Sequence, residues 1–278
     1  MQIRSFFFYP PAFVVHLFLR RFFRCINSGD ILHMDSTHLW LVAASIGVIA
    51  FLYSSVGHAG ASGYIAVLTL FGFAAAVIKP TALVLNILVA CIGTFQFWRV
   101  GHFSWKLFWP FAVLSIPAAY LGGYLHLPGS IFKTLVGVVL LFSAARLFFR
   151  QGDPPEVAAP SRPAALGVGL VIGFLSGLTG TGGGIFLTPL LLFCRWARTR
   201  QAAAVSALFI LVNSIAGLLG YFRGGGPIPS LAWVLAIAAI SGGTIGSYFG
   251  SARFPVRLIQ LLLATVLLIA GFKLVLTS

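Results

Sequence analysis

The sequence predicts an all-α polytopic membrane protein, and its composition and the length of its apolar runs favour that class. Of its 278 residues, 59% are hydrophobic and 8% are charged, whereas about 25% are charged in an average globular chain. The apolar runs are about twice as long as a barrel strand and do not alternate with period two. Backbone groups in lipid must be satisfied internally, so we expect transmembrane helices.

The apolar runs and the breaks between them define ten segments. Their boundaries are 39–56, 63–78, 80–98, 107–126, 131–149, 165–179, 184–194, 201–222, 230–250 and 255–276. Most can cross about 30 Å of hydrocarbon at about 1.5 Å per residue. Segments 184–194 and 165–179 are short, so we expect half-helices or tilted pieces in contact with protein.

These segments divide the chain into four regions. They are an N-terminal extension (1–38), a first membrane repeat (39–150), a Pro-rich polar linker (151–164) and a second membrane repeat (165–278). Two interpretations of the extension stay open. It forms an interfacial amphipathic segment, or its first 33 residues are an over-called start and translation begins at Met34.

The two membrane regions resemble each other at one spacing, 124 residues. The matched pairs are Gly60/Gly184, Gly93/Gly217, Arg99/Arg223, Gly101/Gly225, Leu107/Leu231, Trp109/Trp233, Ala112/Ala236, Gly122/Gly246 and Tyr124/Tyr248. Each half has an odd number of crossings, whether all five segments cross or the first two form a re-entrant hairpin. The second half then enters the membrane upside down. We therefore predict two inverted-topology repeats with glycine-broken half-helices, an architecture common in secondary transporters.

The charges give an orientation and exclude several classes of function. Ten basic residues fall in the loops of one side and four in those of the other, past Met34, which places the first set in the cytoplasm. That set is Arg99, Lys106, Arg146, Arg150, Arg162, Arg195, Arg198, Arg200, Arg253 and Arg257. Because most of the 18 basic residues lie around and between the apolar segments, the net charge of +14 indicates topology and not nucleic-acid binding.

Acidic residues and cysteines are scarce. The four carboxylates, Asp30, Asp35, Asp153 and Glu156, lie outside the long apolar runs. This excludes paired intramembrane carboxylates and a Ca²⁺ or Mg²⁺ cage. The three cysteines form no CxxC pair, so we expect no disulfide framework and no zinc site. An intramembrane enzyme using His58 with Cys91 or Ser62 is disfavoured, because no carboxylate orients the histidine and no nucleophile–base geometry can be read from the sequence. We predict a non-enzyme without metal or cofactor.

Two glycine-rich stretches interrupt the apolar pattern at matching places. We call Gly57–Gly63 the first glycine segment and Gly177–Gly184 the second. Each mid-helix glycine costs up to about 1 kcal/mol relative to alanine, so these runs favour unwinding. Unwound backbone at membrane depth needs protein or a watery cavity around it, and paired breaks in matched halves indicate a transport site. The alternative is that both segments are small-residue packing faces.

The chemistry of these segments favours an anion. Helices restarting near Ser62 and Gly183 would present backbone N–H groups and a positive dipole end, and hydroxyl groups add further donors. His58 either contacts an anion or proton or is a structural histidine; the two asparagines either bind substrate or tie helices together. The candidate substrate-binding residues are Gly57, His58, Gly60, Ser62, Gly63, Asn86, Thr179, Gly180, Thr181, Gly182, Gly183, Gly184 and Asn213.

Several of these motifs together resemble the TauE/SafE family of bacterial membrane transporters. They are the two glycine segments, the run Pro80–Asn86, the helix endings Trp98–Gly101 and Phe222–Gly225, and the Gly-Gly steps at Gly122 and Gly242. The resemblance covers residues 39–276. It implies a carrier in the cytoplasmic membrane for small anions, including sulfite and organosulfur compounds such as sulfoacetate, with both glycine segments at the substrate site.

One departure from the family pattern leaves the identity of the anion open. Family members often have a Gly-Gly-Gly run in both halves, whereas the first glycine segment here reads Gly60-Ala61-Ser62-Gly63, preceded by His58. We expect alternating access of a small sulfur oxyanion or organosulfonate, in the lipid bilayer of the bacterial inner membrane. A passive anion channel on the same inverted pore is the alternative. A homodimer is the default expectation.

Overall fold

The computed structural model describes residues 36–125, 141, 144–145, 148, 153, 156–225 and 227–276. The predicted N-terminal extension and most of the predicted segment 131–149 lie outside these residues. Every regular element in the described part of the chain is helical. The elements are α2 (Ser36–Ser55), α3 (Ala61–Leu70), α4 (Ala75–Arg99), α5 (Trp105–Tyr124), α7 (Arg162–Thr179), α8 (Gly184–Phe193), α9 (Thr199–Arg223), α10 (Ser230–Tyr248), the π-helical turn η1 (Phe249–Arg253) and α11 (Val256–Leu276).

Six of these helices are long and apolar enough to cross a membrane, judged by length and composition. They are α2, α4, α5, α7, α9 and α10, the last continued through η1. The predicted class, an all-α polytopic membrane protein, is therefore confirmed. By length, α3 and α8 are short, with 10 residues each.

The predicted segment 63–78 is wrong, because this stretch contains a helix end. Helix α3 stops at Leu70 and α4 begins at Ala75. Gly72 has φ +78°, its N–H donates to the carbonyl of Thr69, and the N–H of Phe73 donates to that of Leu68. This is the Schellman pattern that closes helices on a left-handed glycine. Gly72 is the feature of the sequence that could have indicated this helix end.

The start of α4 also differs from the prediction, which put a loop before Pro80. Pro80 lies inside the helix, where proline removes one i→i−4 hydrogen bond. The carbonyl left without that partner belongs to Ala76, and the hydroxyl of Tyr221 on α9 donates to it at 3.4 Å. A tertiary contact therefore offsets part of the cost of the proline and lets the helix begin five residues earlier.

For 165–179 the expectation was a half-helix or a tilted piece in contact with protein, and the half-helix is wrong. Helix α7 begins at Arg162 and has 18 residues, enough for a membrane span. Proline occupies its first turn, where a missing N–H is tolerated. The polar linker therefore ends at Ser161, and its last three residues are helical.

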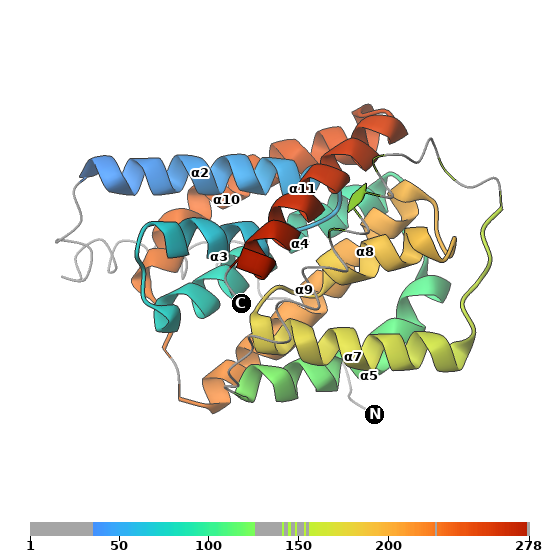
Figure 1. Ribbon diagram of the computed structural model, residues 1–278, viewed down its shortest axis with the longest axis horizontal. Helices are drawn as coiled ribbons and strands as arrows, with labels where there is room; N and C mark the ends of the chain where they lie inside the picture. The colour runs from blue at the N-terminus through green and yellow to red at the C-terminus, as the bar shows by residue number, and fades with distance from the viewer. Residues whose placement is uncertain are drawn as a thin grey trace, which may run out of the picture.

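The long helices pair across the two halves of the chain. Figure 1 shows α2 beside α10 and α5 beside α7, with α4 and α9 between these pairs. Glycines make the contacts close. A Cβ at Gly242 or Gly246 would collide with carbonyl oxygens of α2, and one at Gly173 or Gly177 with carbonyl oxygens of α5. The core follows α4 and α9, whose inward faces are fully buried.

Candidate functional site

The first glycine segment begins as non-helical backbone between α2 and α3, from Gly57 to Gly60, and its last three residues belong to α3. Gly57 and Gly60 have φ values of +80° and +105°, which side chains with a Cβ rarely adopt. A Cβ at Gly57 would also collide with the backbone of Ala203 on α9. Gly63 lies beyond the break, in α3, where a Cβ would meet Ile49 of α2 at 2.5 Å. That glycine serves the packing of α3 on α2.

The second glycine segment begins later than predicted. Gly177 and Thr179 are still helical, and the non-helical stretch runs from Gly180 to Gly183, between α7 and α8. Gly180, Gly182 and Gly183 have φ values of +75°, +76° and +79°. A Cβ at Gly182 would lie 2.8 Å from Nδ2 of Asn86, so this backbone packs directly on α4.

Asn86 joins the two glycine segments. Its Oδ1 accepts the N–H of Ala61 at 3.0 Å, at the start of α3. Its Nδ2 donates to Oγ of Ser214 on α9 at 3.3 Å, beside Gly182. All three residues are buried, and Asn86 has no exposed surface. The structure thus brings the predicted residue Asn86 together with both segments.

The same contact corrects one expectation about the helix starts. The sequence indicated that α3 would offer free N–H groups to a ligand. The first of them, on Ala61, is occupied by Asn86, because a buried N–H without a partner costs about 1–3 kcal/mol. A ligand can reach this amide only if it displaces the asparagine.

His58 makes a second link between the halves. Its Nε2 lies 2.8 Å from Oγ1 of Thr188 on α8, and that hydroxyl donates to Oγ of Ser206 on α9 at 2.7 Å. Since a threonine hydroxyl has one hydrogen, Thr188 accepts from the histidine, and the proton lies on Nε2. His58 is 4% exposed and 3.5 Å from the Cβ position of Gly184.

We call the residues joined by the Asn86 and His58 contacts the polar cluster; the remaining predicted polar residues have hydrogen-bond partners outside it. Ser62 hydrogen-bonds to the hydroxyl of Tyr53 at 2.9 Å. Thr179 donates to the carbonyl of Leu175 and lies 2.8 Å from the hydroxyl of Thr181. Asn213 donates to the carbonyl of Phe209, within its own helix, and its buried Oδ1 has no hydrogen-bond partner among the described residues.

Sequence reasoning missed Lys79. It was assigned to a loop, but it lies in α4, half-buried, with its Cγ 3.1 Å from the Cβ position of Gly180. Its Nζ donates to the carbonyl of Gly123 at 3.4 Å. Nothing near Lys79 in the sequence indicates its contact with Gly180, which lies 101 residues further along the chain. The apolar sequence around Thr188, Ser206 and Ser214 likewise gave no indication that these hydroxyl groups contact the glycine segments or their partners.

Carboxylates are absent from this cluster within the described residues. Glu156 is exposed, and Asp153 accepts the N–H of Thr199 at 2.7 Å and its hydroxyl, at the start of α9. The described part of the chain also holds no group of three metal-ligating side chains. The polar groups of the cluster are therefore hydroxyls, amides, one imidazole and one nearby ammonium.

A family model described as "Sulfite exporter TauE/SafE" matches residues 41–274. The chain belongs to the TauE/SafE family. A probable membrane transporter protein, y4hK of Sinorhizobium fredii, is 43% identical over 249 residues, 87% of this chain and 99% of the relative. Another, YjnA of Bacillus subtilis, is 29% identical over 259 residues, 86% and 100% of the two chains. No solved structure matches this chain.

The family and the six apolar helices identify a multi-pass membrane transporter. The resemblance inferred from the glycine segments and helix endings is confirmed, and membership of a transporter family agrees with the prediction of a non-enzyme.

Proposed function

We propose that this protein is a secondary transporter of small anions, namely sulfur oxyanions or organosulfonates, in the bacterial cytoplasmic membrane. The observation that carries the proposal is the meeting of both glycine segments at Asn86. Irregular backbone at this depth, held by buried polar side chains, is the form that transporter binding sites take.

The chemistry of the cluster supports an anion. Hydroxyl, amide and imidazole N–H groups can donate to the oxygens of sulfite or a sulfonate, and Lys79 places a positive charge beside the second segment. A cation would need carboxylates or several free carbonyls. Among the described residues near the segments no carboxylate is present. The name of the matched family, sulfite exporter, supports the sulfur oxyanion class.

Alternating access rests on the inverted repeats, which the helix arrangement supports. Helices α4 and α9 each have 25 residues and begin 124 residues apart. Shifted by this spacing, the α2–α10 pair corresponds to the α7–α5 pair. Such an exchange of partners is expected when two copies of one unit are related by a two-fold axis. The α2–α10 pair can then rock against the α5–α7 pair around Asn86.

Counterflow in proteoliposomes tests the proposal. Vesicles loaded with sulfite or sulfoacetate should take up the radiolabelled anion against its gradient, with saturation. Asn86→Leu, and the double change Gly182→Leu with Gly183→Leu, should lower this uptake at least tenfold. Gly167→Leu is the matched control, because a Cβ at Gly167 meets nothing within 4 Å.

Three outcomes would contradict parts of the proposal. Steady single-channel currents without counterflow would indicate the passive anion channel. Unchanged counterflow in both folded variants would place the binding site elsewhere. Counterflow of cations alone would exclude the anion class.

A further inference from the structure

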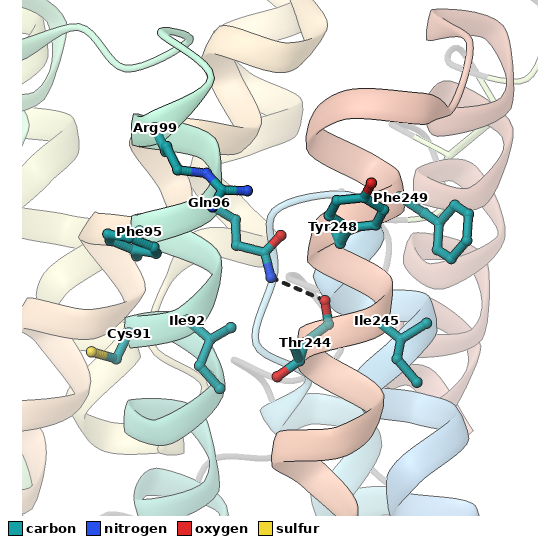
Figure 2. Close-up of a pocket in the computed structure, with 9 residues that line it drawn as sticks. All are labelled: Cys91, Ile92, Phe95, Gln96, Arg99, Thr244, Ile245, Tyr248 and Phe249. Atoms are coloured by element: carbon teal, nitrogen blue, oxygen red, sulfur yellow. Dashed lines mark hydrogen bonds between the residues drawn. The ribbon is translucent and has the colours of Figure 1, made fainter.

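A groove lies between α4 and α10, apart from the glycine segments. Its volume is about 720 Å³, and Ile92, Phe95 and Ile245 form its walls, with Arg99 and Tyr248 at one end (Figure 2). Phe95 and Ile245 are 53% and 52% exposed, so the groove is open along its length. Arg99 lies 13 residues beyond Asn86, about 20 Å along the helix.

Gln96 holds the two helices apart. Its side chain is 8% exposed, and its Nε2 donates to the carbonyl of Thr244 on α10 at 3.1 Å. The residue 124 positions later is Gly220, where an added Cβ would collide with the carbonyl of Tyr120. Helices α9 and α5 therefore touch through their backbones, whereas glutamine occupies the corresponding space between α4 and α10.

The same glutamine leaves a buried acceptor unused. Oε1 of Gln96 has no hydrogen-bond partner among the described residues, and Figure 2 shows it pointing to the space between Arg99 and Tyr248. A buried amide oxygen without a donor is unfavourable. A ligand with a hydroxyl group would satisfy it.

The mouth of the groove is basic. Arg99 is exposed and lies over the ring of Phe95, 5.9 Å from its centroid. Arg253 donates to the hydroxyl of Tyr248 at 3.4 Å. Apolar walls below two guanidinium groups match a molecule with an acyl chain and an anionic head, and basic pockets between membrane helices bind such lipids.

We propose that this groove binds one phospholipid with an anionic, hydroxylated headgroup, of the phosphatidylglycerol class. The phosphate lies at Arg99, a headgroup hydroxyl donates to Oε1 of Gln96, and an acyl chain covers Ile92 and Ile245. Because the groove depends on glutamine at position 96, the second half has no equivalent site between α5 and α9.

Native mass spectrometry of the purified full chain tests this inference. The protein is titrated with phosphatidylglycerol or with phosphatidylcholine of identical acyl chains. One phosphatidylglycerol should be retained at least three times more than phosphatidylcholine. Arg99→Gln should reduce its retention to the phosphatidylcholine level, and Arg99→Lys should keep most of the difference.

Arg223→Gln is the matched control, since Arg223 ends α9 as Arg99 ends α4, and it should change nothing. Equal retention of both lipids, or equal losses in Arg99→Gln and Arg223→Gln, would overturn the proposal. So would retention of neither lipid together with efficient Cys91–Cys91 cross-linking, because a second copy of the chain would then fill the groove. Anion counterflow is measured in parallel, so failure of this site and failure of the transport proposal are distinguishable.

Discussion

At the scale of single residues, Gly182 has two separate reasons to be glycine. Its φ of +76° lies in the left-handed region, and a Cβ there would also meet Asn86 Nδ2 at 2.8 Å and Cγ2 of Ile210 at 2.7 Å. Backbone strain and steric contact can be separated, because the chain offers glycines that have only one of these features or neither.

Alanine at three glycines should give three different results. Gly225 has φ +82° but open space around it, so Gly225→Ala should cost about 1–2 kcal/mol from backbone strain alone. Gly182→Ala should cost more, because the contact adds to the strain. Gly167→Ala, in a helix with open space, should cost nothing or stabilise by up to about 1 kcal/mol. Chemical unfolding in detergent measures all three. Equal losses of unfolding free energy in Gly182→Ala and Gly225→Ala would show that the contact with Asn86 adds no cost to the backbone strain.

His102, in the loop between α4 and α5, should make stability depend on pH. Partial burial and the charge of Arg200 lower its pKa below 6.5, against an opposing hydrogen bond to the carbonyl of Ser251. The folded state therefore disfavours the charged ring, and the unfolded chain binds the proton first. Stability should be constant above the unfolded pKa of about 6.5 and should fall as the pH drops below it.

In His102→Gln, the decrease in thermal stability between pH 7 and pH 5 should become smaller. Thermal unfolding at a series of pH values measures this. A slope that survives the substitution would assign the effect to another group. His38, for which the same substitution can be made, is exposed near the start of α2 and serves as the control.

At this scale, part of the candidate site follows from the sequence. His58, Asn86 and the glycines at 182–184 were predicted from their positions in the breaks and spans, and the structure brings them together. Lys79, Thr188 and Ser214 were missed, because each acquires its importance from a contact more than 100 residues away along the chain. A lone hydroxyl in an apolar helix carries no local signal of such a contact.

At the scale of the helices, two ladders of glycine spaced four residues apart set the packing. Gly169, Gly173 and Gly177 of α7 lie against carbonyls of α5. Gly242 and Gly246 of α10 lie against carbonyls of α2 in the same way. Small residues at this spacing let membrane helices approach closely. The sequence interpretation weighed small-residue packing for the glycine segments, and Gly63 and Gly177, at their helical ends, do pack in this way. The other glycines of the ladders lie outside the two segments.

Replacing one glycine of a ladder by a larger residue should separate a helix pair. Gly173→Leu would drive a side chain into the backbone of Ser115 and should destabilise the protein by at least the 1–3 kcal/mol typical of overpacking. Gly167→Leu, on the same helix, should have little effect. Thermal unfolding in detergent compares them. Equal stability of the two variants would contradict this packing role.

Helix boundaries show what local sequence could and could not predict. The long apolar spans were predicted to within a few residues, because lipid demands unbroken apolar runs. The end of α3 at Leu70 and the early start of α4 were missed. The first depends on the left-handed Gly72, a local signal, whereas the second depends on Tyr221, a residue of the other half.

At the scale of the whole molecule, the most extensive helix contacts join the two halves of the chain. Helix α2 packs on α10, and α5 packs on α7. We expect residues 1–155 and 156–278, expressed separately, to be degraded or to aggregate, and to copurify as a complex with counterflow activity when expressed together. Affinity purification through a tag on one fragment measures this. A first half that folds alone would contradict the exchange of partners.

The pairing of α2 with α10 also affects the order of events during synthesis. Ser55 ends α2 and Ser230 begins α10, so 174 residues separate them. At about 5–20 residues per second, the ribosome needs about 10–35 s to make them. Until then the carbonyls of α2 that later contact Gly242 and Gly246 face lipid or a temporary neighbour. The first described helix to enter the membrane is thus among the last to gain its permanent partner.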